Sequence, residues 1–194
     1  MKTHFRVALA LCLALAVPCI ATAQVGGRGL LFQVGAGLYF PSYPGSLESD
    51  FSDLASLPGM DRIQISLDLA LGVPVLERGC YLIARIDGGG DRVDDGNDYI
   101  QMNLYLFSLG ARYYPYRTGL YVEVGAGASK GVIESSVAAS SPSDTGFGYG
   151  IAIGYDFNRR QRGFGLSLEA KYDGLTIESE QYGALMFTLN LCWR

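Results

Sequence analysis

Five charged residues lie in segments where polar and apolar residues alternate, and they share the polar faces of these segments mostly with small residues. They are Asp68, Arg85, Glu123, Glu169 and Lys171. A charge that is enclosed by protein is costly unless an opposite charge pairs with it. The chemistry that this set predicts is therefore ion pairing in a narrow interior, with Asp68 and Arg85 as the first pair.

The sequence offers few residues that are suited to acid–base catalysis. His4 is the only histidine, and it lies in a leader segment that we expect to be removed. A Ser-His-Asp triad and a histidine-bound zinc ion are then both unavailable. We expect a protein that is not an enzyme, with no catalytic residues, no metal and no cofactor.

Two other motifs offer weaker chemistry. Gly146, Gly148 and Gly150 resemble part of a phosphate-binding loop, but they lie inside an alternating segment and no helix follows. Small interior spacers are the better interpretation. The range 87–98 is rich in Asp, yet its spacing matches neither an EF-hand nor a calcium-binding repeat. We interpret it as a solvated hairpin loop, with calcium binding as the alternative.

The first 23 residues are predicted to be a Sec signal peptide. A charged start is followed by the apolar run 7–17, and small residues then predict cleavage between Ala23 and Gln24. The folded domain is therefore expected to span residues 24–194. Two of the 15 Lys and Arg residues, Lys2 and Arg6, lie in the leader, so 13 basic side chains remain against 19 acidic ones. This negative balance argues against nucleic acid as a partner.

The dominant pattern in residues 24–194 has a period of two, which is the side-chain period of a β-strand. In Ile63–Val73, every second residue is a large aliphatic one, and the residues between are Gln, Ser, Asp, Ala and Gly. Seven further segments show the same split. The eight predicted strands span 30–40, 63–73, 80–87, 99–113, 120–129, 146–157, 164–172 and 182–193. In the fourth strand, the apolar residues change phase near Phe107, which predicts a β-bulge.

The predicted connections differ in length at the two ends. Short ones span 74–79, 114–119 and 158–163, longer ones span 41–62, 88–98 and 130–145, and one of intermediate length spans 173–181. This pattern is typical of transmembrane barrels. A soluble barrel fits less well, because Gly and Ala dominate the polar face. We predict an all-β, eight-stranded antiparallel up-and-down transmembrane β-barrel with short periplasmic turns and longer extracellular loops.

Two more local predictions concern the first long loop and the first short turn. The spacing of Leu47, Phe51, Leu54 and Leu57 predicts a short helix, which covers the barrel mouth or binds a partner. A register centred on the turn at 74–79 pairs Leu71 with Leu82 and places Asp68 directly opposite Arg85. The other three interior charges are expected to extend this pair into a network.

The chain resembles the eight-stranded outer-membrane barrels of the OmpA, OmpX and opacity-protein type, often labelled porin family. The segments that carry the resemblance are Leu109–Pro115 and Gly119–Gly127, together with a last strand that ends in the aromatic Trp193. Arg194 follows where such proteins usually stop. The resemblance implies Sec export to the outer membrane of a Gram-negative-type bacterium, contact with outer-membrane lipids, and recognition of the last strand by the barrel-assembly machinery.

Fold alone does not choose a function within this family. The interior of eight strands is just wide enough for side chains to fill. The first hypothesis is therefore a structural or surface-interaction anchor with a plugged polar lumen, whose long loops can bind an extracellular ligand. The alternative is a small diffusion channel. A lipid-modifying outer-membrane enzyme is disfavoured, because the histidine base is missing.

Overall fold

The computed structural model describes residues 29–76, 79–115, 118–158 and 163–193. The predicted signal peptide and its cleavage site at Ala23 and Gln24 lie outside these ranges. In the described part of the chain, eight long antiparallel strands form a barrel: β1 (Leu31–Ser42), β2 (Asp61–Leu76), β3 (Cys80–Asp94), β4 (Tyr99–Tyr113), β5 (Leu120–Ser135), β7 (Gly146–Asp156), β8 (Phe164–Ile177) and β9 (Glu180–Trp193). The short strand β6 (Ser141–Pro142) and the helix α2 (Leu47–Ala55) complete the elements.

The long strands follow one another around the barrel in chain order. Each pairs with the next, and β1 also pairs with β9, which closes the sheet. The strand β6 adds only a two-residue ladder to β5. This arrangement confirms the predicted eight-stranded up-and-down barrel. No helix in the described ranges is long and apolar enough to cross a membrane.

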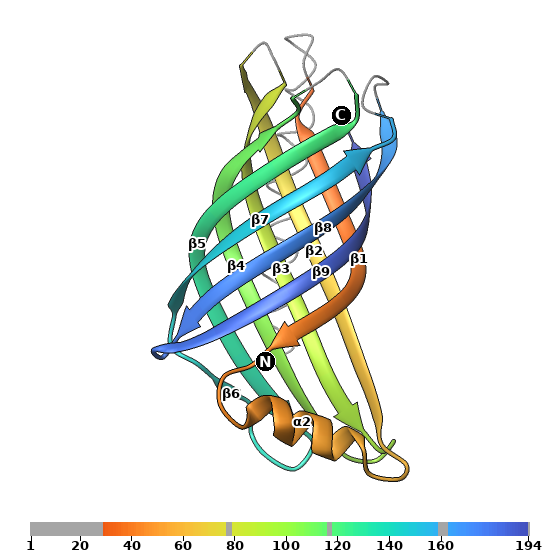
Figure 1. Ribbon diagram of the computed structural model, residues 1–194, viewed down its shortest axis with the longest axis vertical. Helices are drawn as coiled ribbons and strands as arrows, with labels where there is room; N and C mark the ends of the chain where they lie inside the picture. The colour runs from red at the N-terminus through yellow and green to blue at the C-terminus, as the bar shows by residue number, and fades with distance from the viewer. Residues whose placement is uncertain (1–28, 77–78, 116–117, 159–162, 194) are drawn as a thin grey trace.

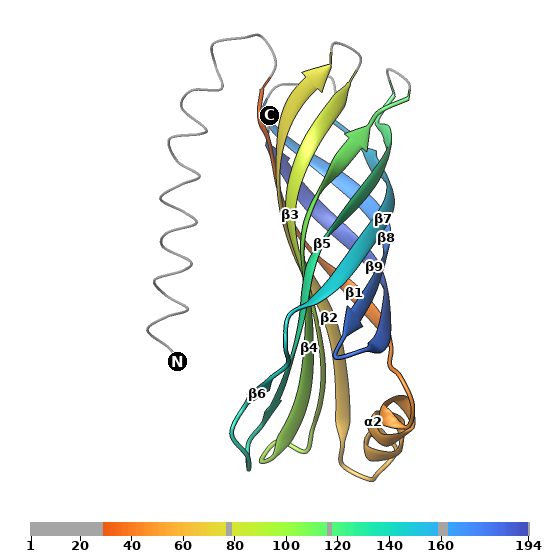
Figure 2. The same cartoon turned by 90° about the vertical axis from the view of Figure 1, so that its left-hand side faces the viewer.

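The two ends of the barrel differ in shape. At the turn end, strands β2 and β3, β4 and β5, and β7 and β8 are joined by short connections. At the helix end, β2 to β5 are 15 or 16 residues long and extend well past β7, β8 and β9, as Figures 1 and 2 show. There β1 separates from β2: their pairing ends at Leu38 and Ile65, while β1 continues along β9 to Ser42. The helix α2 lies at this end, between these two strands in the chain.

Large apolar side chains cover the outside of the barrel over most of its height. Leu67 and Leu109 are 62% and 68% exposed, which would be extreme in a water-soluble protein but is expected where lipid is the solvent. The inward positions between them carry Gly, Ala, Ser and charged residues. This is the orientation that the period-two pattern predicted.

Two predictions about the helix end are wrong. β4 has no β-bulge near Phe107, because it pairs with β3 and β5 without a register shift. The predicted loops there are also too long, since β3, β5 and β8 continue as strands to Asp94, Ser135 and Ile177. Both errors have one cause, which is that the apolar residues of these strands change from the outward to the inward face as the strands leave the apolar band.

The predicted helix within residues 45–57 is confirmed as α2. Phe51 is buried, and Leu47 and Leu54 pack beside it against the inner side of the barrel. Leu57, the fourth residue of the predicted apolar face, lies beyond the helix and is half exposed. The helix therefore covers the mouth with its apolar face turned inward.

Candidate functional site: the ionic network of the lumen

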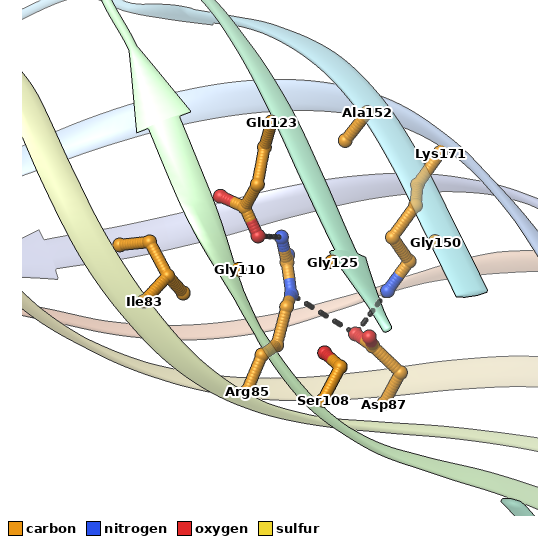
Figure 3. A pocket seen from close by; sticks show the side chains of 10 residues that line it. All are labelled: Ile83, Arg85, Asp87, Ser108, Gly110, Glu123, Gly125, Gly150, Ala152 and Lys171. Carbon is orange, nitrogen blue, oxygen red and sulfur yellow. Dashed lines mark hydrogen bonds and ion pairs between the residues drawn. The ribbon is translucent and has the colours of Figure 1, made fainter. Parts of the chain in front are cut away.

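Arg85 is the centre of a group of charged side chains that fills the middle of the barrel. Its guanidinium lies 3.0 Å from Asp87, 2.7 Å from Glu123 and 3.3 Å from Asp68, and it also pairs with Glu169. These residues are all buried. Figure 3 shows Arg85 between Glu123 and Asp87. One planar cation thus connects carboxylates from four strands, which suits the fixed fork of five donors that arginine provides.

Arg112 is a second buried guanidinium on the turn-end side of the first. It donates to Glu123 at 2.6 Å and to the side-chain carbonyl of Gln33 at 2.8 Å, and its carbon centre lies 4.1 Å from the ring centroid of Tyr121. The Tyr121 hydroxyl in turn donates to Glu169 at 2.8 Å. Glu123 and Glu169 are therefore each held by both arginines.

Lys171 holds the opposite side of the network. Its ammonium group pairs with Asp87 and lies 3.9 Å from Asp173 (Figure 3 shows the contact with Asp87). Since Asp87 also pairs with Arg85, it links the lysine to the arginine cluster. The network therefore crosses the whole width of the lumen.

The structure brings all five predicted interior residues into this one network, but not in the predicted register. Asp68 pairs across the strands with Asp87, and Arg85 pairs with Ala70, so β2 and β3 are shifted by two residues. The shift preserves which residues face inward, because the period of a strand is two. Asp68 and Arg85 still form an ion pair, as diagonal rather than direct neighbours.

The two-residue shift originates at Pro74, which the sequence pattern predicts as the first residue of the turn. In the structure β2 continues through Pro74 to Leu76, with an irregularity between these two residues. The ladder between β1 and β2 begins with Leu31 opposite Gly72. Pro74 thus lies past the paired part of β1 and has a partner, Tyr81, on β3 only. A strand tolerates proline at such a one-sided position.

Several members of the network were not predicted, namely Arg112, Asp87, Asp173, Gln33 and Tyr121. Arg112 lies on the polar face of its strand, so the alternation contained the signal for it. Asp173 was assigned to a loop, because the outward apolar row of β8 ends at Tyr172. The space for Tyr121 depends on Gly154, where a Cβ atom would lie 2.2 Å from the ring. Cys192 is buried beside Ser167, and it and Cys80 are free thiols.

Acidic groups outnumber basic ones in the middle of the lumen. Arg85, Arg112 and Lys171 face five buried carboxylates: Asp68, Asp87, Glu123, Glu169 and Asp173. One oxygen of Asp68 and one of Asp173 have no hydrogen-bond partner. Two cavities of about 10 Å³ flank the network, each with room for about one water molecule. The middle layer is thus densely filled and contains two more carboxyl groups than cationic ones.

An aromatic layer closes the turn end. The rings of Tyr81, Tyr114 and Tyr121 follow one another with centroid distances of 6.0 and 5.3 Å. Tyr114 and Tyr121 are almost completely buried. Beside them, Leu31 and Ile83 are buried in a small apolar cluster.

An apolar layer, which we call the apolar cap, closes the helix end. Its buried members are Tyr43, Phe51, Val93, Met102, Leu104, Leu106, Leu175 and Ile177. Arg62 joins the cap to the wall, since it holds the buried carboxylate of Asp91 in a two-pronged contact and lies over the Phe51 ring. The Tyr43 hydroxyl donates to the same carboxylate at 3.0 Å. Burial, followed by the proximity of Tyr39 and Asp91, raises the pKa of Tyr43 and keeps it a neutral donor.

No metal centre is evident in the described ranges, where no three or more His, Cys, Asp or Glu side chains converge as metal ligands. The acidic side chains of the predicted hairpin loop have structural partners instead. Asp95 accepts hydrogen bonds from the backbone of Asn97 and Asp98, and Asp98 accepts one from Ser136. The described residues contain no histidine.

A closed barrel with an apolar outside and a charged inside defines an outer-membrane type of protein. The sequence profile of the outer membrane protein beta-barrel domain matches residues 7–194, and the chain belongs to this family. The search of curated proteins finds no match.

Solved structures similar to this chain include three bacterial outer-membrane barrels. Ail, the attachment invasion locus protein of Yersinia pestis, is 14% identical over 84% of this chain and 97% of its own, with a TM-score of 0.49. Neisserial surface protein A is 16% identical over 83% and 95%, with a TM-score of 0.48. The N-terminal β-barrel domain of Pseudomonas aeruginosa OprF is 18% identical over 84% and 97%, with a TM-score of 0.45.

Proposed function

We propose that this protein is a closed anchor in the outer membrane that holds a structured extracellular cap and its loops at the cell surface. The observation that supports this function is the filling of the lumen by three successive layers of side chains. The layers are aromatic at the turn end, ionic in the middle and apolar under α2. A solute would have to displace all three layers to cross the barrel.

A non-enzymatic role is part of this proposal. The buried carboxylates of the network pair with Arg85, Arg112 and Lys171, and the cavities of about 10 Å³ beside them are too small for a substrate. We further propose Sec export and assembly through β9, whose outward residues alternate as expected for an insertion signal. These residues are Leu185, Phe187, Leu189, Leu191 and Trp193. An extracellular ligand for the loops remains a prediction.

Planar-bilayer recording on the refolded full chain tests the closed lumen. We expect no stable conductance steps from the wild type or from Arg92→Ser, which alters a partly exposed ion pair outside the lumen. The paired variant, Arg85→Ser, removes the central cation and should produce transient openings. A stable conductance of the wild type that prefers cations would support the diffusion channel instead, because carboxylates outnumber cations in the middle of the lumen.

A further inference from the structure

The outside of β3, β4 and β5 changes character abruptly toward the helix end. Ile86, Phe107 and Ala128 are the last outward apolar residues of their strands before the change, and they are neighbours in the sheet. The next outward residues are Gly88, Tyr105 and Lys130, which are also neighbours in register. From there the outward positions are mainly polar to the strand ends. We call this surface the outer polar face: Gly88, Gly90, Arg92, Asp94, Tyr99, Gln101, Asn103, Tyr105, Lys130 and Glu134. Asn103 is itself buried among its neighbours, and the apolar Val132 lies between Lys130 and Glu134 on the outward row of β5.

In the described part of the chain this surface is confined to β3, β4 and β5. On the neighbouring β2 the outward row stays apolar as far as Ile63, which pairs with Arg92. The strands β7, β8 and β9 are shorter, and their outward rows stay apolar or aromatic as far as Phe147, Tyr172 and Leu185. Figures 1 and 2 show β3, β4 and β5 extending past them. The inner side of the same wall is occupied by the apolar cap, so its outer side is the free one.

The outer polar face combines flat aromatic and amide side chains with Gly88 and Gly90, which carry no side chain. The Arg92 guanidinium lies 4.2 Å from the centroid of Tyr99, and it pairs with Asp94 at 2.8 Å. Gly88 leaves room for the Tyr105 ring, since a Cβ atom there would lie 3.3 Å from it. The Gln101 amide donates to Asn103 at 2.7 Å.

These groups suit the recognition of sugars. Amides and paired charges offer both donors and acceptors to hydroxyl groups, and tyrosine rings are amphipathic surfaces that are favoured at the headgroup level of membranes. The charges of Arg92 and Asp94 largely cancel, as do those of Lys130 and Glu134, so the face has no strong preference for a charged partner.

We propose that the outer polar face binds the sugar rings of the glycolipid in the outer leaflet. Continuity with the apolar band identifies this occupant, because the face begins on the same strands, one outward residue beyond the band that the acyl chains cover. A glycolipid whose acyl chains lie against Ile86, Phe107 and Ala128 places its headgroup directly against Gly88, Tyr105 and Lys130. The proposal concerns the outer wall and does not depend on whether the lumen conducts.

The test places the refolded full chain in nanodiscs of three compositions. The first holds phospholipid only, the second adds a glycolipid with its core sugars, and the third adds the same phosphorylated lipid anchor without those sugars. Glycolipid retention and the NMR shifts of the Gln101 amide and the Tyr105 ring are measured. We expect retention of the sugar-bearing form to exceed that of the sugar-free form by about tenfold, as the gain of two or three hydrogen bonds provides.

Matched variants locate the contact. Gln101→Ala and Tyr105→Ala should each reduce the retention ratio by about three- to tenfold, as expected for the loss of one or two hydrogen bonds. Gln181→Ala on β9 and Tyr155→Ala near the turn end should leave it unchanged. A change of electrophoretic mobility on heating verifies that each variant is folded. The NMR shifts of the wild type test the proposal without any substitution.

Three results would overturn the proposal. Equal retention of the two lipid forms would mean that the phosphates alone are recognised. Unchanged retention in both face variants would mean that the sugars bind elsewhere. Concentration-dependent cross-linking of two chains through Gln101 or Tyr105 positions, unaffected by glycolipid, would assign the face to a second copy.

Discussion

The lipid-facing part of the barrel and its helix end are built from the same strands but place their apolar side chains on opposite sides. In β4, Leu109 and Phe107 face outward and are well exposed, whereas Leu104 and Met102 face inward and are buried in the apolar cap. The strand passes between the two regions without a bulge. What changes is the solvent on its outer side, which is lipid on the turn-end side of the boundary and water on the helix-end side.

The two interiors are stabilised in different ways. The lipid-spanning part is filled by ion pairs, whose attraction must offset the large cost of removing both partners from water. The interior of the helix end is filled by apolar side chains, as in a soluble protein, and its stabilisation comes from the area removed from water. A single missing partner is therefore more harmful in the network than a shortened side chain is in the cap.

The largest effect should follow the replacement of the central cation. Arg85→Met leaves the carboxylates of Asp87, Glu123 and Glu169 close together without their shared partner. We expect a loss of about 3–5 kcal/mol in the free energy of unfolding, measured by urea titration in detergent micelles. Arg92→Met is the control, because its ion pair with Asp94 is partly exposed and should contribute about 1 kcal/mol or less. Equal losses in both variants would contradict the difference between the two interiors.

The next effect concerns the apolar cap. Phe51→Ala removes the buried ring of α2 and should cost about 3 kcal/mol locally. Because the eight-stranded ladder does not depend on the helix, we expect amide exchange in α2 to accelerate by about a hundredfold while exchange in β8 and β9 is unchanged. Leu57→Ala, at a half-exposed site next to the helix, should change exchange by about twofold at most. Faster exchange throughout the barrel would mean that cap and lumen are one cooperative unit.

The fold could be predicted from sequence wherever lipid lies outside the strands. There the outward row must be apolar, and Ile63–Val73 or Phe164–Tyr172 show this directly. The same rule placed Asp68, Arg85, Glu123, Glu169 and Lys171 in the interior, since a charge in these segments has no other face available. The rule fails at the helix end, where Met102, Leu104 and Leu106 face inward and imitate an outward row that is out of phase.

The pairing within the network could not be predicted in the same way. Register depends on the geometry of a short turn, and the use of Pro74 as a strand residue shifted β2 against β3 by two positions. The central role of Arg85 and the partners of Arg112 depend on which strands lie across the lumen, and a period-two pattern does not contain this information. Contacts such as Arg85 with Glu169 join strands that are far apart in the chain.

A charge on the outer surface tests where the polarity changes. Leu109→Lys places an ammonium group in the apolar band and should cost about 2–4 kcal/mol, since lipid does not solvate it. Gln101→Lys places the same charge on the same face of the same strand, but on the helix-end side of the boundary. It should cost about 1 kcal/mol or less. Urea titrations in lipid vesicles compare the two variants. Similar costs would place the lipid boundary beyond Gln101 and would remove the proposed outer polar face from the aqueous side.

The smallest effect concerns the loop tip, outside both regions. The backbone N–H groups of Asp98 and then Asn97 donate to the Asp95 carboxylate and hold its pKa below the usual range. A lowered pKa in the folded state means that the contribution of this turn is present above the ordinary pKa and is lost as the pH falls through the lowered value.

A carboxyl NMR titration should therefore show Asp95 protonating at a lower pH than an unperturbed aspartate. The amide signals of Asn97 and Asp98 should move with the same midpoint, and Asp95→Asn should abolish that movement. Signals from α2 and from the lumen should not follow this midpoint, because the Asp95 side chain is exposed and its hydrogen bonds stay within its own turn. Movement of the α2 signals with the same midpoint would show that the loop tip is coupled to the apolar cap. The comparison of two separate regions would then not hold.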